Sequence, residues 1–259
     1  MTSLSIAITG AGSGLGQGAA LGLARAGHRV LAGVQFDAQV GEIAALGEPN
    51  LRAEKIDLLA SADRERLAGR DIDVLINNAA VSETGPIAEQ PLDLVRKVFE
   101  VNVFSTLALT QAVAKAMVTR GRGRIVFVSS MVGLMPIPYV GAYSASKHAL
   151  EAIATVLQAE LAPHGVEVIT FQPGPYKTGF NDRMWATQKA WFKPGVNFTR
   201  AEDMAKTAAL LDGQFDPQGA IDALAALASE PSPRFRNVVP MPIEEAIKAT
   251  QADAWTRRI

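Results

Sequence analysis

Short apolar runs, mostly without polar alternation, are the feature of this chain that most restricts its fold. They predict strands at 5–10, 29–34, 52–58, 73–79, 123–130 and 166–174. Helical patterns lie between several of them, at 16–27, 92–121 and 143–165. Strands that are buried on both faces and separated by helices are typical of a parallel sheet. Right-handed crossovers then give a doubly wound α/β fold with helices on both faces.

The pattern loosens after residue 174. Residues 175–200 are expected to be irregular and are rich in aromatic side chains. Helices are predicted at 201–212 and 216–229, an edge strand at 234–240 and a surface helix at 242–255. The edge strand brings the sheet to about seven strands. Because no repeat, low-complexity segment or linker is present, we predict one domain over 1–259, with a tail at about 241–259.

Composition excludes several classes of protein. The 259 residues, 48% of them hydrophobic, suffice for one sizeable core, and the net charge of −1 gives no reason to expect a nucleic-acid partner. The absence of cysteine excludes disulfides and thiolate metal sites and fits a cytoplasmic protein. The N-terminus lacks a charged region before its apolar run, and no apolar run approaches ~18 residues, so we expect no signal peptide and no membrane partner. The scattered His28, His148 and His164 predict no metal site.

The stretch "TGAGSGLG" joins the first predicted strand to the first predicted helix. Its Gly10, Gly14 and Gly16 have the spacing G-x-x-x-G-x-G. A loop without Cβ atoms lets the backbone approach a pyrophosphate, and the helix N-terminus supplies N–H groups. The alternative is a tight turn that binds nothing. The position at the first strand–helix junction of a parallel sheet favours dinucleotide binding.

Further motifs follow in a fixed order. "NNAA" (77–80) ends the fourth predicted strand, Asn102 lies in a predicted helix, Ser130 ends the fifth predicted strand, and Tyr143 and Lys147 form Y-x-x-x-K. Together with the loop, these motifs resemble the short-chain dehydrogenase/reductase family over about residues 4–180. The resemblance implies a Rossmann-type fold, and the overall look is similar to hydroxysteroid- and retinol-dehydrogenase-like relatives. Ala80 replaces the family's usual glycine.

The spacing of Tyr143 and Lys147 has a chemical reason. Side chains four apart on a helix share a face. Tyrosine, with an ordinary pKa of ~10, is a poor base at neutral pH, and a nearby ammonium lowers that pKa. We therefore expect Tyr143 to be the acid/base and Ser130 to polarise the substrate oxygen. In isolation, Tyr143 would be read as a half-buried aromatic, Lys147 as a solvated helix residue and Ser130 as a cap.

The resemblance adds roles for other residues. It implies that Lys147 holds the nicotinamide ribose, for which the small residues 144–146 leave room, and that Asn102 anchors a water in a proton relay. The predicted catalytic residues are thus Ser130, Tyr143, Lys147 and Asn102. The predicted cofactor contacts are Gly10, Ser13, Gly14, Leu15, Gly16, Gln35, Asp57, Asn78, Ala79, Tyr143, Lys147, Pro173, Gly174, Tyr176 and Thr178. For Asp57, a helix N-cap is the alternative.

The end of the second predicted strand bears on the choice of cofactor. NAD users commonly have an acid there, and NADP users an arginine just after it. Here Val34 and Gln35 occupy these positions, and no Lys or Arg occurs from 30 to 51. A 2′-phosphate needs a cation, so we favour NAD over NADP.

The substrate side is expected to be apolar. Trp185, Trp191 and Phe192 fit either a mobile lid at about 175–200 or a surface helix that docks its aromatics into the core. Met131, Leu134, Met135 and Tyr139 follow Ser130 and suggest a hydrophobic or aromatic alcohol or ketone. Arg183 and Lys177 remain candidates for binding a substrate carboxylate.

The leading hypothesis is an NAD(P)-dependent oxidoreductase that interconverts a secondary alcohol and a ketone. A nucleotide-sensing regulator on the same fold is the alternative, although such proteins typically lose the tyrosine or the lysine. An epimerase or dehydratase would carry a G-x-x-G-x-x-G loop and a larger C-terminal domain. The resemblance also implies a homodimer or homotetramer that assembles through the helices at 92–121 and 143–162.

Overall fold

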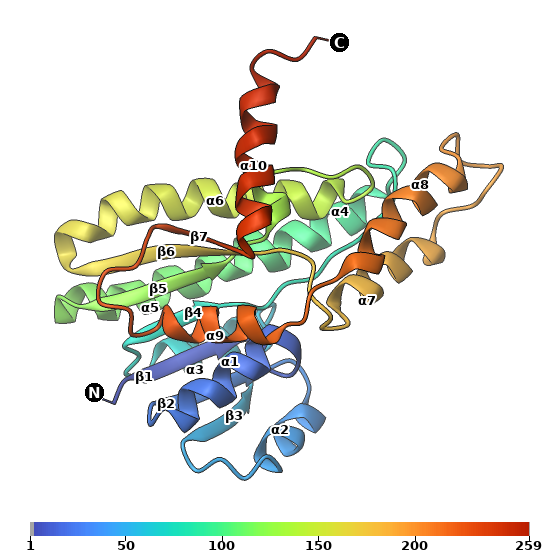
Figure 1. The fold of residues 1–259 in the computed structure, drawn as a ribbon. Coiled ribbons are helices and arrows are strands. Elements are labelled where there is room, and N and C mark those ends of the chain that lie inside the picture. The colour runs from blue at the N-terminus through green and yellow to red at the C-terminus, as the bar shows by residue number, and fades with distance from the viewer. Residues whose placement is uncertain (1–2, 259) are drawn as a thin grey trace.

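The computed structural model describes residues 3–258 and is built on one parallel sheet of seven strands (Figure 1). The strand order is β3-β2-β1-β4-β5-β6-β7, and every neighbouring pair is parallel. The strands are β1 (Ser5–Thr9), β2 (Arg29–Val34), β3 (Leu51–Lys55), β4 (Val74–Asn77), β5 (Gly123–Val128), β6 (Val166–Pro173) and β7 (Arg236–Val239). The predicted doubly wound fold of about seven strands is confirmed.

Helices cover both faces of the sheet. They are α1 (Gly14–Arg25), α2 (Asp37–Ala44), α3 (Ser61–Ala68), α4 (Leu92–Phe99), α5 (Thr106–Arg120), α6 (Gly141–Leu161), α7 (Phe180–Ala186), α8 (Ala201–Ala208), α9 (Gln218–Ala226) and α10 (Met241–Ala254). The sequence did not reveal α2 and α3, because each has eight residues and buries only one of them. The prediction that residues 175–200 are irregular was wrong at 180–186, where α7 forms.

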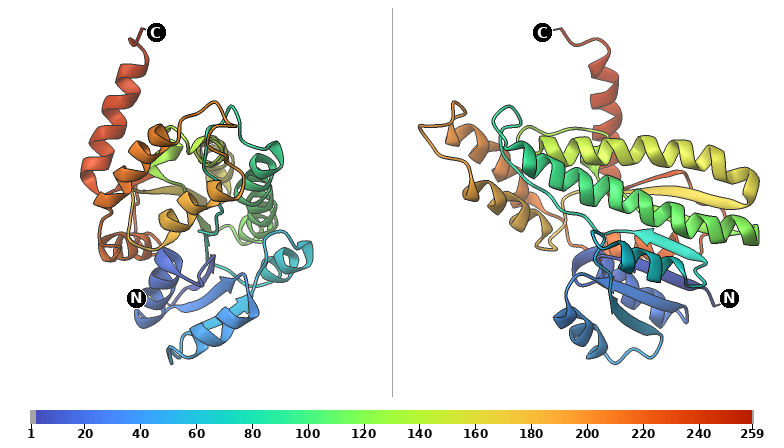
Figure 2. Two further views of the ribbon diagram at one scale, coloured as in Figure 1. Left: turned by 90° about the vertical axis from the view of Figure 1, so that its right-hand side faces the viewer. Right: turned by 180° about the vertical axis from the view of Figure 1, so that it is seen from behind.

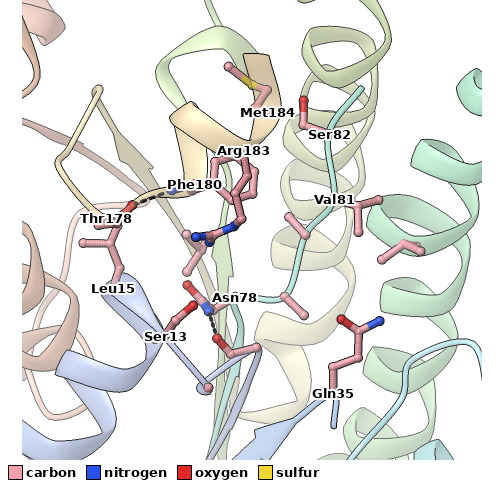
Figure 3. Close-up of a pocket in the computed structure, with 18 of the residues that line it drawn as sticks. Ser13, Leu15, Gln35, Asn78, Val81, Ser82, Thr178, Phe180, Arg183 and Met184 are labelled. Atoms are coloured by element: carbon pink, nitrogen blue, oxygen red, sulfur yellow. Dashed lines mark hydrogen bonds between the residues drawn. The ribbon is translucent and has the colours of Figure 1, made fainter. Parts of the chain in front are cut away.

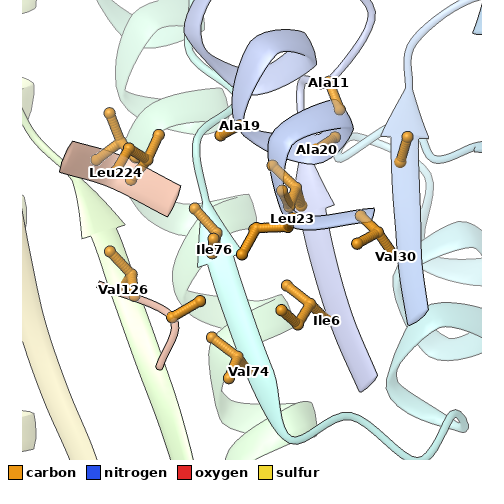
Figure 4. Close-up of a cluster of buried hydrophobic side chains, with 14 of the residues drawn as sticks. Ile6, Ala11, Ala19, Ala20, Leu23, Val30, Val74, Ile76, Val126 and Leu224 are labelled. Carbon is orange, nitrogen blue, oxygen red and sulfur yellow. The ribbon is translucent and has the colours of Figure 1, made fainter. Parts of the chain in front are cut away.

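Alternate residues of each central strand enter different cores. Ile6 and Ile8 of β1 face a cluster that contains Leu23 of α1 and Leu224 of α9 (Figure 4). Ala7, between them, faces the other cluster, beneath α3, α5 and α6. Because both faces of the sheet are buried in this way, the strands read as apolar runs without alternation.

The predicted helix at 92–121 is interrupted by a wider π-helical turn. Residues Glu100–Ser105 form this turn between α4 and α5. By length and composition the continuous segment Leu92–Arg120 would suffice to cross a membrane. However, 50% of its most apolar 18-residue stretch is buried inside the protein. That burial is what the core helix of a folded domain shows. Figure 2 shows α5 running beside α6 on one face of the sheet.

The C-terminal elements agree with the sequence pattern. β7 is the edge strand that was predicted at 234–240 and pairs only with β6. The predicted helix at 242–255 is α10, which stands out from the body of the protein (Figure 2). Its buried Ile247 and a hydrogen bond of 3.1 Å from Thr250 Oγ1 to Met135 Sδ attach it to the rest.

Two glycines with the same backbone conformation offer a test of packing near the start of β6. Gly165 has φ +72° and Gly121 has φ +67°, but only at Gly165 would an added Cβ lie 2.2 Å from a backbone oxygen, that of Gly121. We predict that Gly165→Ala lowers the free energy of unfolding by about 3 kcal/mol, and Gly121→Ala by about 1 kcal/mol from backbone strain alone.

Urea unfolding of both variants measures these changes. Gly22→Ala serves as a control, because Gly22 lies inside α1 with nothing within 4 Å of its added Cβ. It should raise stability by up to ~1 kcal/mol. If both variants lost the same free energy of unfolding, the contact between the added Cβ at position 165 and the carbonyl oxygen of Gly121 would have no energetic cost.

Candidate active site

One cavity of about 740 Å³ lies at the carboxyl ends of the strands. The sheet changes direction of winding between β1 and β4, and a doubly wound fold binds its ligands at such a point. The cavity is lined by every predicted catalytic and cofactor residue except Asn102. Residues from "TGAGSGLG", "NNAA", Y-x-x-x-K and the segment 173–178, far apart in the sequence, are thus brought together.

The glycine loop is held by the end of β4. Asn78 Nδ2 donates to the carbonyl oxygens of Thr9 (2.9 Å) and Gly10 (3.0 Å). An added Cβ at Gly10 would lie 2.6 Å from Ala79 Cα, and one at Gly16 would lie 2.4 Å from Asn78 Nδ2. The glycines therefore permit this close packing, and they also line the cavity at the N-terminus of α1. The loop is a tight turn whose free N-terminal N–H groups suit a phosphate.

Tyr143 and Lys147 lie on the face of α6 that borders the cavity. Both are buried, with 7% and 2% of their surface exposed. Lys147 Nζ donates to the carbonyl oxygen of Val128 at 2.8 Å and lies 5.5 Å from the centre of the Tyr143 ring. The interpretation of Lys147 as a solvated helix residue is wrong, because a buried amine fixed by a strand carbonyl is not a surface group.

Burial governs the protonation of this pair. It raises the pKa of the Tyr143 phenol, and the hydrogen bond with Ser130 only partly opposes this. Burial also lowers the pKa of Lys147 to about 7, although the negative charge of Glu151 opposes that shift. From the sequence, Lys147 was predicted to lower the pKa of Tyr143. In the structure, the net effect of all neighbours and of burial is to raise that pKa. The reason is that removing the phenolate from water outweighs its neighbours.

Ser130 has two roles in the geometry. It lines the cavity, and its Oγ accepts a hydrogen bond of 3.3 Å from the N–H of Val132, so it also caps the short turn Met131–Gly133. The expectation that residues 144–146 leave room for a ribose is wrong, because none of them lines the cavity. Ser146 instead donates to the carbonyl oxygen of Tyr143 at 2.8 Å.

Asn102 lies behind the cavity in the π-helical turn. It is 1% exposed. Its side chain accepts from the N–H of Val81 (2.9 Å) and donates to the carbonyl oxygen of Val81 (2.8 Å) and to Ser146 Oγ (3.0 Å). Asn102 thus fixes the segment after β4 to α6. Its role in anchoring a water stays a prediction.

The end of the cavity beside β2 and β3 carries acids and amides. It is lined by Gln35, Phe36, Gln39, Glu42 and Asp57. Gln39 is a residue that the sequence analysis missed together with α2, and its Oε1 accepts from the N–H groups of Gln35 and Phe36, both at 3.1 Å. Asp57 is not a helix N-cap, because α3 begins at Ser61 after Ala60.

Apolar side chains line the cavity beside Tyr143. Phe180 and Met184 belong to the same small cluster as Tyr143, and the Phe180 ring lies 5.7 Å from that of Tyr143. Leu134 and Met135 were expected on the substrate side, but both contact α10: the carbonyl oxygen of Leu134 accepts from Gln251, and Met135 Sδ from Thr250.

The aromatic residues of 181–195 pack inward. Phe192 is buried and meets Trp191 edge-on, with ring centres 6.1 Å apart. Trp191 lies against Gly85, where an added Cβ would be 2.2 Å from the indole ring. These two side chains therefore dock into the body of the protein, as one of the two alternatives predicted. A lid movement of this segment stays a prediction.

Three charged residues complete the lining. Glu83 and Lys97 form an ion pair of 2.9 Å. Arg183 extends from α7 into the cavity, toward Asn78 and the glycine loop (Figure 3). From the sequence, Arg183 was a candidate only for binding a substrate carboxylate. Its spacing from other motifs gave no signal that it would lie above the loop. Among the described residues, no group of acids and histidines could hold a metal ion.

Comparison with known proteins gives the family. The family model described as short chain dehydrogenase matches residues 5–189. The uncharacterized oxidoreductase YbbO of Escherichia coli is 37% identical over 199 residues, which cover 74% of each chain.

Solved structures share the fold over nearly the whole chain. A short chain dehydrogenase of Burkholderia cenocepacia in complex with NADP is 27% identical, with a TM-score of 0.76 over 98% of this chain and 95% of that one. A short chain dehydrogenase/reductase of Burkholderia phymatum in complex with NAD is 24% identical, with a TM-score of 0.83 over 99% and 96%. With the family model, the relative and the site in agreement, the chain belongs to the short-chain dehydrogenase/reductase family of oxidoreductases.

Proposed function

We propose that this protein interconverts a secondary alcohol and a ketone by hydride transfer, with Tyr143 as the acid/base. The observation that carries the proposal is the meeting of Ser130, Tyr143 and Lys147 at one cavity with the glycine loop. A nicotinamide cofactor bound in this cavity supplies or accepts the hydride. The family membership supports a redox reaction, and the geometry supports its proton step.

The protein's own residues account for that step. During reduction, the developing alkoxide needs a proton, and a buried neutral phenol at Tyr143 can donate it. The Ser130 hydroxyl donates a hydrogen bond to the same oxygen and polarises it. In the oxidation direction Tyr143 must first lose its proton, which positive charge on Lys147 favours. The raised pKa of Tyr143 keeps the acid form as the resting form.

The substrate is proposed to be hydrophobic or aromatic. Phe180 and Met184 line the cavity near Tyr143, and Met131, Ile137 and Trp185 pack around the same small cluster. Apolar side chains beside the hydroxyls of Ser130 and Tyr143 would orient a ketone by its oxygen.

NAD is the proposed cofactor. Gln35, Gln39, Glu42 and Asp57 line the end of the cavity where the adenosine would lie, and among the described lining residues the cations are Lys97, Lys147 and Arg183, at other parts of the cavity. Amides and carboxylates suit ribose hydroxyls, whereas a 2′-phosphate beside two carboxylates without a cation is repelled.

The first prediction concerns Tyr143. Tyr143→Phe should lower kcat by about 10²–10⁴-fold, because it removes the transferable proton. NADH affinity, measured by fluorescence titration, should stay within about threefold. Tyr139→Phe is the matched control, since Tyr139 does not line the cavity. Near-normal turnover of the Tyr143 variant would exclude the mechanism, and NADH binding without turnover of any ketone in a varied panel would favour the regulator.

The second prediction concerns the cofactor. The dissociation constant for NADH should be at least ~10-fold below that for NADPH, since a charged group without a partner costs more than about 1.4 kcal/mol. Gln35→Arg should strengthen NADPH binding by about 10-fold. Gln158→Arg adds the same charge on an exposed part of α6 and should change neither affinity. Tighter binding of NADPH by the unaltered protein would reverse the assignment.

The third prediction concerns Arg183. Since this side chain extends over the glycine loop, we expect it to contact the cofactor pyrophosphate (Figure 3). Arg183→Gln should raise the dissociation constants for NADH and ADP-ribose by about 10-fold. Lys177→Gln is the control, because Lys177 is exposed and does not line this cavity. Unchanged cofactor binding with a raised KM for the ketone would instead assign Arg183 to the substrate.

A further inference from the structure

Glu151 is a buried carboxylate that the proposed reaction does not use. It is 4% exposed and lies on α6, one turn beyond Lys147. A carboxylate taken out of water costs several kcal/mol unless charges and hydrogen bonds compensate for it. Its neighbours therefore indicate whether it is ionised and which group its charge affects.

The two oxygens of Glu151 face different neighbours on β6 and β7. Gln172 of β6 accepts from the N–H of Asn237 through Oε1 (3.0 Å), so its Nε2 must face the other way. That Nε2 donates to Glu151 Oε1 at 2.8 Å and to Thr170 Oγ1 at 2.6 Å. The second oxygen, Oε2, lies 3.4 Å from Nε of Arg236 on β7. One oxygen of Glu151 therefore accepts from a fixed donor, whereas the other is buried beside a cation without a hydrogen-bond partner among the described residues.

The negative charge of Glu151 acts on Lys147. Tyr143, Lys147 and Glu151 are spaced four residues apart and share one face of α6. Lys147 is the more deeply buried of the two charged groups and has only the carbonyl oxygen of Val128 as a hydrogen-bond partner among the described residues. Burial lowers the pKa of Lys147, and the negative charge of Glu151 on the same helix face opposes this shift.

A charge from another element also faces Glu151. Arg236 of β7 faces Glu151 and is about half exposed, at 47% of its side chain. β5 and β6 present Val128, Thr170 and Gln172, and the π-helical turn approaches through Asn102, all uncharged. Tyr143 is the remaining titratable neighbour. Within the described chain, Glu151 is therefore the nearby anion that can keep Lys147 protonated.

We propose that Glu151 is a positioning residue whose charge increases the cationic fraction of Lys147 at neutral pH and thereby sets the pH range in which Tyr143 accepts a proton. This inference rests on the proposed function of Tyr143 and Lys147. The sign follows from the charges. Without the carboxylate, Lys147 loses its proton at lower pH, the phenolate loses its cationic neighbour, and alcohol oxidation begins at higher pH.

The test measures the protonation of Lys147 directly and the pH dependence of the reaction separately. Competitive labelling with acetic anhydride, followed by peptide mass spectrometry, gives the pH midpoint at which Lys147 becomes reactive in the full-length protein. Glu151→Gln should lower this midpoint by about one pH unit and raise the lower pH limb of kcat/KM for alcohol oxidation. Glu151→Asp keeps the charge and should restore both toward the original values.

Matched variants separate charge from folding. Glu160→Gln removes a carboxylate at the exposed end of α6 and should shift neither readout. If Glu151→Gln alone does not fold, Glu151→Gln with Arg236→Gln removes both charges together and should give a smaller downward shift of the labelling midpoint. A folded variant of either kind with an unshifted midpoint overturns the inference.

The two readouts also distinguish this inference from the proposed function. A shifted midpoint with a shifted rate profile supports both. A shifted midpoint with an unmoved rate profile leaves Glu151 as the group that controls the charge of Lys147, but it overturns the proposed effect of Lys147 on Tyr143.

Discussion

The common direction of the seven strands is the constraint on which the site depends. Because all strand pairs are parallel, their carboxyl ends meet along one edge of the sheet. The glycine loop follows β1, "NNAA" ends β4 and Ser130 follows β5, so these motifs converge although they are far apart in the sequence. Helices that bury both apolar faces of the sheet hold the strands in this arrangement.

Polar groups behind the cavity hold the reactive ones in place. Asn102 bonds to both backbone groups of Val81 and to Ser146, which in turn bonds to the carbonyl oxygen of Tyr143. Asn102 lies within the π-helical turn and contacts two other segments from there. A buried polar network with satisfied partners makes the position of α6 unique in a way that apolar packing alone does not.

Much of the fold and the site could be predicted from the sequence, where a pattern was long or a motif was specific. The apolar strand β2 was predicted at the bounds that the structure has, whereas α2 was missed because it buries only Ile43. Gln39 was not predicted either, because it reaches Gln35 only through the first turn of α2. The pKa of Tyr143 was predicted in the wrong direction, because the Y-x-x-x-K spacing reveals the neighbour but not the burial.

The protonation of Tyr143 and Lys147 depends on their burial as much as on the charged and polar groups beside them. A phenol and an amine buried together both favour their neutral forms, so the resting pair is an acid beside a weakly held cation. Charge must then be supplied from outside the pair for Tyr143 to act as a base. Glu151 lies on the far side of Lys147 from Tyr143, where its charge can stabilise the ammonium while lying farther from the phenolate. Its pairing with Arg236 at the sheet edge lowers the cost of burying it there.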